Sequence, residues 1–223
     1  MKKVLIALVA LLSTTTALAF DRAADVDRLE SSATILNEIM SAPDKGIPEE
    51  VFSNAKCVAV IPSMLKAAFG VGGAYGKGVA SCRTEHGWSA PAFFSLRGGS
   101  FGFQIGGEAA DIVMLIMNDR GMSELLASRV KLGADASAAA GPVGRHADAS
   151  TDWKLQAELL TYSRARGLFA GISLNGAILE QHQDDTRQFY GHMVPFRTIL
   201  RGQIPSPKEA EIWRATLVKY GGK

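Results

Sequence analysis

The chain has 223 residues, of which 47% are hydrophobic and 21% are charged. This composition is that of a globular protein and excludes a disordered or collagen-like chain. The two cysteines are too few to staple a disulfide-built miniprotein. Glycine is unusually concentrated, because eleven of the 23 glycines fall between Gly70 and Gly107, and the fold must account for this cluster.

The first nineteen residues have the pattern of a secretory signal peptide. Lys2 and Lys3 open the chain, the run from Val4 to Leu12 is apolar, and Ala17-Leu-Ala19 forms a small-x-small site. The apolar run is far shorter than the roughly 20 residues that a membrane-spanning helix needs. We therefore expect residues 1–19 to be removed before Phe20 and the protein to be exported, to the periplasm or the medium. The alternative is a buried N-terminal helix.

Removal of this segment changes the charge balance. Taking Lys2 and Lys3 from the 24 basic residues leaves 22, which equals the number of acidic residues. Binding to nucleic acid depends on several contacts between phosphates and a basic surface. A neutral mature chain does not predict a nucleic-acid partner, so any attraction to anions must come from a local basic patch.

Two helices are predicted before the glycine-rich region. Apolar side chains recur over residues 21–41 at spacings of three and four, as in an amphipathic helix. They are Val26, Leu29, Ala33, Leu36 and Met40. After a break, Pro48-Glu-Glu50 is typical of a second helix start, with proline in the first turn and acids near the positive end of the helix dipole.

The pattern then changes to short runs that predict strands. We expect strands over 56–61, 68–84, 89–97, 100–107 and 110–117. The segment from Ile112 to Met117 is continuously apolar, which indicates a strand covered on both faces.

The glycines of the second run fall in phase. Gly70, Gly72, Gly76 and Gly78, with Ala74 between them, share one parity, so one face of this strand carries almost no side chains. Repeated glycine indicates strong bending or another element lying close on the backbone. A phosphate-binding loop does not fit, because Gly78 stands where that motif needs Ser or Thr. The pattern favours a strongly curved or barrel-like antiparallel sheet.

The remaining elements are a helix, further strands and a C-terminal helix. We expect a helix over 121–132, strands over 153–162 and 167–174, and a polar stretch over 181–188. Ser206-Pro-Lys-Glu209 is typical of a capping box, and it precedes a helix on which Trp213, Leu217 and Tyr220 share a face. No internal repeat or linker divides the chain. We expect one α+β domain over residues 20–223, with helices at both ends and a helical extension over about 193–223.

The two cysteines are candidates for a disulfide. Cys57 and Cys82 both follow the leader, and each lies in a β-like run. In an oxidising compartment their pairing would close a loop of about 25 residues, worth on the order of 3 kcal/mol in the chain-entropy model. Two separate buried thiols are the alternative. A redox site is not indicated, because the Cys-x-x-Cys spacing is missing.

One segment matches a hydrolase motif. Gly98-Gly-Ser-Phe-Gly102 fits the Gly-x-Ser-x-Gly pattern, with Ser100 as the nucleophile. That motif needs a helix after the serine, whereas an alternating β-like pattern follows here. A serine hydrolase also needs a histidine beside Ser100, and His86 and His192 are the candidates.

The other ionisable residues do not indicate an enzyme. The four histidines, His86, His146, His182 and His192, show no metal spacing. His182 with Asp184 and Asp185 is either a metal candidate or a solvated polar turn, and Asp111 is either an unusual acid or a satisfied structural carboxylate. We expect no catalytic site, no metal and no cofactor.

Several short motifs follow one another along the chain. They are Ala55-Lys-Cys-Val-Ala-Val-Ile-Pro62, Gly72-Gly-Ala-Tyr-Gly-Lys-Gly78, Gly87-Trp-Ser-Ala-Pro91, Gly98-Gly-Ser-Phe-Gly102, Gly106-Gly107, Asp111 to Asn118, Gly141-Pro-Val-Gly-Arg145, Tyr162-Ser-Arg-Ala-Arg-Gly-Leu-Phe-Ala-Gly171 and Phe189-Tyr-Gly191. Their order is typical of the SYLF domain, which this chain resembles over roughly residues 21–192.

The resemblance implies a non-catalytic, lipid-binding domain. Its eukaryotic members are endocytic proteins that bind phosphoinositides and associate with actin, and bacteria carry exported versions. In the eukaryotic members a lysine-bearing N-terminal helix contributes to membrane contact. The corresponding helix is acidic here, with Asp21, Asp25, Asp27 and Glu30 against Arg22 and Arg28. That part of the mechanism does not carry over, and we do not expect actin as a partner of an exported protein.

Lipid binding would need exposed apolar surface together with cations placed for phosphate oxygens. The candidates from the matched motifs are Lys66, Lys77, Arg97, Arg145 and Arg166. For each of them, a solvated charge or a structural ion pair is the alternative. The competing function is a structural or interaction protein of the cell envelope, with an envelope protein as its partner. A large, flat apolar patch would favour that function, and a closed apolar cavity would favour lipid binding.

Overall fold

The computed structural model describes residues 2–42, 46–69, 71–99, 109–143, 157–165, 168–171 and 173–222. The helical elements are α1 (Lys2–Ser41), α2 (Glu49–Asn54), α3 (Asp119–Leu125), α5 (Gln183–Tyr190), α6 (Phe196–Leu200), the 3-10 turn η2 (Lys208–Ala210) and α7 (Glu211–Gly221). The strands are β1 (Cys57–Phe69), β2 (Val71–Thr84), β3 (Gly87–Trp88), β4 (Ala92–Gly99), β5 (Ala109–Ile116), β6 (Arg129–Lys131), β7 (Ala138–Ala140), β8 (Leu159–Ala165), β9 (Leu168–Gly171) and β10 (Ile178–Gln181).

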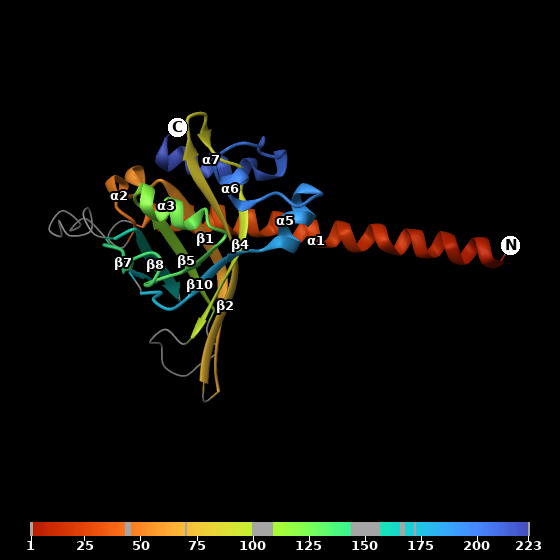
Figure 1. The fold of residues 1–223 in the computed structure, drawn as a ribbon, viewed down its shortest axis with the longest axis horizontal. Helices are drawn as coiled ribbons and strands as arrows, with labels where there is room; N and C mark the ends of the chain where they lie inside the picture. Colours follow the sequence, from red (N-terminus) through yellow and green to blue (C-terminus); the bar gives the residue numbers. More distant parts are fainter. Residues whose placement is uncertain are drawn as a thin grey trace.

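The strands form a strongly curled sheet with the order β6-β10-β4-β2-β1-β5-β8-β7, while β3 pairs with β2 and β9 with β8. Every pairing between these strands is antiparallel except that of β7 with β8. Figure 1 shows β1 and β2 extending past the shorter strands, and the N-terminal part of α1 extending away from the rest of the molecule. The expected α+β fold, with a curved sheet and helices at both ends, is confirmed.

The sheet separates two hydrophobic cores, because successive side chains of a strand point to opposite faces. One core takes Cys57, Ala59 and Ile61 of β1, and the other takes Val58 and Val60. The first is the inside of the curl, since it joins residues from β6 and β10 at one end of the sheet to β8 at the other. We call it the inner core, and we call the second the outer core.

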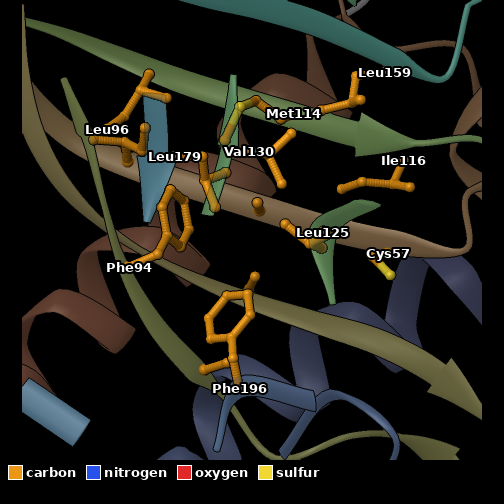
Figure 2. Packing of buried hydrophobic residues seen from close by; sticks show 14 of the residues in the cluster. Cys57, Phe94, Leu96, Met114, Ile116, Leu125, Val130, Leu159, Leu179 and Phe196 are labelled. Atoms are coloured by element: carbon orange, nitrogen blue, oxygen red, sulfur yellow. The ribbon is translucent and has the colours of Figure 1, made fainter. Parts of the chain in front are cut away.

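Figure 2 shows the packing of the inner core. The strands contribute Phe94 of β4, Val130 of β6 and Leu179 of β10. The helices contribute Leu125 of α3 and Phe196 of α6, which fill the space inside the curled sheet. The outer core is covered instead by α1, α2, α5 and α7. The face of α7 predicted from the sequence is confirmed, since Trp213 and Leu217 are buried there and Tyr220 packs against them.

The glycine phase of β2 is explained by close packing on its inner face. A Cβ atom at Gly78 would lie 2.4 Å from the carbonyl oxygen of Val60, and one at Gly76 would lie 2.5 Å from Cγ2 of Ile61. Gly73 has the opposite parity, and its nearest neighbour would be 4.0 Å away. Glycine is therefore needed where neighbouring groups lie close to the inner face of β2. Of the two reasons expected from the sequence, this confirms the close approach of another element to the backbone.

The predicted helix over 121–132 is wrong in its second half. Helix α3 ends at Leu125, Ser128 takes a left-handed backbone conformation with φ of 68°, and β6 follows. The cause is tertiary, because Val130 pairs with Leu179 of β10 and both side chains enter the inner core. Local periodicity could not reveal this partner.

Two further predictions need correction. The polar stretch at 181–188 is largely the helix α5, whose first turn His182 caps by accepting from the N–H of Asp185. The capping box at Ser206 does not form, because Pro207 is the N-cap of η2 and no side chain caps it. The expected strands over 100–107 and at the start of 153–162 lie outside the described residues, and β8 and β9 account for the rest of that region.

Candidate functional site

The outer face of the sheet carries one row of directly paired residues that the helices leave uncovered. We call it the cross-strand row, and it crosses six strands. Its members are Lys131 of β6, Ile178 of β10, Arg97 of β4, Tyr75 of β2, Leu65 of β1 and Ala109 of β5. Directly paired residues point to the same face, and Tyr75 shares its parity with Val79 of the outer core. The whole row therefore points outward.

The centre of the cross-strand row is apolar and exposed. Leu65 is 64% exposed and Tyr75, directly opposite it, is 45% exposed. Large apolar side chains this exposed are few in the described part of the chain, where the others are Ile212 and Val218 of α7. A tyrosine combines an apolar ring with a polar tip, which suits a boundary between apolar and aqueous phases. Leu65 and Tyr75 therefore form an exposed apolar contact surface rather than the lining of a closed cavity.

Cations flank this apolar pair on one side. Arg97 is the register partner of Tyr75 and forms an exposed ion pair with Glu180. Lys131 is exposed at the β6 end of the row. Exposed ion pairs contribute little to stability, so the Arg97 guanidinium can exchange Glu180 for another anion at small cost. The arrangement presents two positive groups beside two apolar ones on a single surface.

The five cations predicted from the sequence do not lie together in one site. Arg97 lies in the cross-strand row, and Lys66 lies next to Leu65 in β1, opposite Ala74, although its side chain is outside the described part. Lys77 is on the outer face two residues from Tyr75, but its ammonium group lies 2.9 Å from Oδ1 of Asp185. Arg145 and Arg166 fall outside the described residues.

Lys77 belongs to a group of ionisable side chains that we call the charge cluster. It joins three elements, and its members are Asp25 and Arg28 of α1, Lys77 of β2, and His182 and Asp185 at the start of α5. One guanidinium nitrogen of Arg28 lies 2.8 Å from Oδ1 of Asp25 and 2.9 Å from Oδ2 of Asp185. Both carboxylates are buried, so the cluster fastens α1 and α5 to the sheet.

The two carboxylates of the charge cluster have opposite pKa shifts. Burial alone would raise the pKa of Asp185, but its interactions with His182 and Lys77 and the charge of Arg28 outweigh burial and lower that pKa to about 2. Burial, and then the charge of Asp185, raise the pKa of Asp25 to about 6 despite the nearby Arg28. The difference follows from the number of donors, since Oδ2 of Asp25 has no hydrogen-bond partner in the described structure.

Asp111 is a structural carboxylate, which was one of the two expected alternatives. Its Oδ1 accepts from the backbone N–H of Ser63 at 2.8 Å, and its Oδ2 accepts from Nε of Arg164 at 2.7 Å. Arg164 also pairs with Glu38 of α1. Burial raises the pKa of Asp111, while the Ser63 N–H acts in the opposite direction. Through these contacts the Asp111 carboxylate and Arg164 connect α1 to the part of β1 where the strand register shifts, between Ile61 and Met64.

The acids and histidines that raised the metal alternative can be placed in the described part of the chain. No group of three or more His, Cys, Asp or Glu side chains lies there in a metal-binding arrangement. Asp184 pairs with Arg187, and His182 serves as the cap of α5. Ser100, the serine of the hydrolase motif, and His146 fall outside the described residues.

A cavity of about 490 Å³ opens near the β2–β3 turn and the start of α7. His86, Trp88, Gln203 and Arg214 are among its lining residues, and Arg214 is paired with Glu211. The lining is mostly polar, so it is not the closed apolar cavity that an enclosed lipid tail would need. The described residues also include no helix with the length and hydrophobicity required to span a bilayer. The cross-strand row, unlike this cavity, presents exposed apolar side chains beside cations.

Comparison with known proteins identifies the chain's relatives. A family model described as Ysc84, "Las17-binding protein actin regulator", matches residues 97–220. The chain belongs to the Ysc84 family. This confirms the resemblance to the SYLF domain, and the residues matched to the Ysc84 model include Arg97, Lys131 and Ile178 of the cross-strand row.

The curated relatives within the Ysc84 family are longer proteins. The chain is 36% identical over 189 residues to "SH3 domain-containing YSC84-like protein 1" of Rattus norvegicus and 35% identical over 189 residues to the Homo sapiens protein of that name. Each match covers 82% of this chain and 55% of the relative. "Protein YSC84" of Saccharomyces cerevisiae is 34% identical over 181 residues, which is 78% of this chain and 38% of the yeast protein. The chain thus spans about half of the animal relatives' length, and less of the yeast protein.

Proposed function

We propose that this Ysc84-family chain is a non-catalytic module that contacts anionic membrane surfaces through its cross-strand row. The observation that carries the proposal is the placement of exposed Leu65 and Tyr75 directly opposite each other, in register with Arg97. Lys131 extends the same line at the sheet's end. Apolar side chains can enter the boundary between head groups and acyl chains, while the cations meet phosphate oxygens.

The expected affinity is modest. Each Lys or Arg near an anionic surface contributes about 1 kcal/mol, and buried apolar area contributes roughly 25 cal/mol per Å². Without residues 1–19 the chain has equal numbers of basic and acidic residues, so long-range attraction is small. Binding should depend on short-range contacts and should weaken with added salt.

We propose that the module acts outside the cytoplasm after cleavage between Ala19 and Phe20, as the N-terminal pattern predicts. The words "actin regulator" describe the family model, and an exported chain would not meet intracellular actin. N-terminal sequencing of the protein recovered from its envelope fraction or medium should begin at Phe20. A sequence beginning at Met1 would contradict both the cleavage and the reason for setting actin aside.

Co-sedimentation with vesicles tests the membrane contact. We expect retention on phosphatidylcholine vesicles containing phosphatidylserine and little retention on phosphatidylcholine alone. Neutralising one cation removes about 1 kcal/mol, so Arg97→Gln and Lys131→Gln should each weaken binding about fivefold. Tyr75→Ser should weaken it as well, through loss of apolar contact.

The chain supplies matched controls for these variants. Arg187 is about as exposed as Arg97 and is likewise ion-paired, but it lies on α5. Ile212 is 48% exposed, close to the value for Tyr75, and lies on α7. Arg187→Gln, Ile212→Ser and Ser100→Ala should bind normally. Equal, salt-independent retention on both vesicle types, or none on either, would reject the membrane contact and favour the envelope-protein interaction. Equal weakening by the α5 and α7 variants would reject the cross-strand row as the site.

A further inference from the structure

The charge cluster lies where α1 meets the sheet, and one of its carboxylate oxygens has no hydrogen-bond donor in the described structure. Asp25 is 1% exposed, its Oδ1 accepts from Arg28, and its Oδ2 has no hydrogen-bond partner in the described structure. The same guanidinium nitrogen of Arg28 donates hydrogen bonds to Asp25 and to Asp185. Two buried carboxylates that share one donor repel each other when both are charged.

Of the two carboxylates, Asp185 is the one that stays ionised, because more groups stabilise its charge. Besides Arg28, Lys77 donates to Oδ1 of Asp185 at 2.9 Å. Nδ1 of His182 lies 3.1 Å from the same oxygen and 3.3 Å from the Asp185 backbone nitrogen. Neutral His182 accepts from that N–H, whereas protonated His182 donates to the carboxylate. Asp25 has only Arg28, so of the two carboxylates Asp25 binds a proton more readily.

The groups around Asp25 come from each element packed there. They are Arg28 of α1, Asp185 and His182 of α5, and Lys77 of β2. Arg22, one turn earlier on α1, is engaged with Glu209 of η2. Proton uptake by Asp25 removes the repulsion between the two carboxylates while leaving Asp185 paired with Lys77 and Arg28.

We infer that Asp25 is a proton-dependent latch that sets how firmly the segment of α1 around Asp25 and Arg28 is docked on the sheet. With Asp25 protonated, α1 is held firmly against α5 and β2. With Asp25 ionised, the segment carries a buried charge with one unsatisfied oxygen, and it docks less firmly. Lys77 is two residues from Tyr75 on the same face of β2, so this docking also sets how much of the outer face is uncovered.

The direction of the pH effect follows from the geometry and from the raised pKa of Asp25. A carboxyl whose pKa rises from 3.8 in the unfolded chain to about 6 in the folded one binds its proton more tightly when folded. Its contribution to stability is complete below pH 3.8 and is lost as the pH rises through 6. This shift corresponds to an increase on the order of 100-fold in the unfolding equilibrium constant.

The test compares the protein with its Asp25→Asn variant, which mimics the protonated form. The ratio of the two unfolding equilibrium constants should rise between pH 4 and pH 7 by about ten- to a hundred-fold. At pH 7, amide hydrogen exchange over residues 22–32 should be slower in Asp25→Asn, while exchange over 211–221 should be unchanged. Asp27→Asn alters an exposed acid on the same helix and should change neither measurement.

His182 contacts Asp185 within the same cluster, so its contribution needs a control of its own. In a His182→Asn background, where asparagine can still cap α5, the pH-dependent difference between proteins with and without the Asp25→Asn substitution should persist. A flat ratio from pH 4 to pH 7, or a difference that disappears with His182, would overturn the assignment to Asp25. A pH-dependent ratio with unchanged exchange over 22–32 would show that Asp25 titrates without controlling the docking of α1.

Discussion

Replacing Asp185 with alanine should lower the free energy of unfolding by about 3–5 kcal/mol at pH 7, because it removes the carboxylate on which a buried charge network converges. Lys77 would lose its carboxylate partner, and Arg28 would keep only Asp25. The result is measurable by urea unfolding monitored by tryptophan fluorescence or circular dichroism. Part of this loss should also appear in the unaltered protein at low pH, where Asp185 becomes protonated.

The pH direction for Asp185 is opposite to that for Asp25. Its pKa is lowered from 3.8 to about 2 in the folded protein, so its stabilising contribution is complete above 3.8 and is lost as the pH falls toward 2. Asp184, its exposed neighbour, pairs only with Arg187 among the described contacts, and Asp184→Ala should cost about 1 kcal/mol or less. Equal effects of the two alanine variants would contradict the role given to Asp185.

Loss of the disulfide should cost about 3 kcal/mol, within the 2–5 kcal/mol typical of small exported domains. Cys57 and Cys82 are directly paired on β1 and β2, and the structure joins them across 25 positions of sequence. The Cys57→Ala/Cys82→Ala variant should unfold at lower urea concentration than the oxidised protein. A reductant should destabilise the protein carrying Cys57 and Cys82 and should leave the double variant unaffected.

Thiol labelling checks whether the bond exists in the isolated protein. After unfolding without reductant, the protein should show no reactive cysteine, and after reduction it should show two. Two reactive thiols before reduction would mean that the bond is absent, and the stability difference would then have to come from packing. Both sulfur-bearing residues are fully buried in the inner core, so the double alanine variant also loses some packing.

Much of the fold follows from local pattern. The parity of Gly76 and Gly78 indicated a bare strand face, and the two neighbouring β-like runs around Cys57 and Cys82 placed the disulfide. These features depend on strands next to each other in the chain. The order of the motifs was also enough to predict the family, because family membership can be inferred from residue patterns without knowledge of spatial contacts.

The candidate site was harder to predict from the sequence than the fold. Leu65, Tyr75 and Arg97 meet only after the register of three strands is fixed, and Ile178 and Lys131 arrive from much later in the chain. The partner of Lys77 is Asp185, which is 108 positions away. Of the five predicted cations, Arg97 has its side chain placed in the row. A tyrosine of opposite parity to the glycines was the one local signal that pointed to the outer face.

The Cys57–Cys82 bond closes the β1–β2 pair at the end where its two strands enter and leave, far from the turn that connects them. The enclosed segment is a covalent ring. A protease that cuts once inside this ring would not release a fragment, and the nicked protein would keep its full mass until it met a reductant. Two pieces would then separate on a denaturing gel. The chain would therefore stay in one piece after a single cut in its longest hairpin.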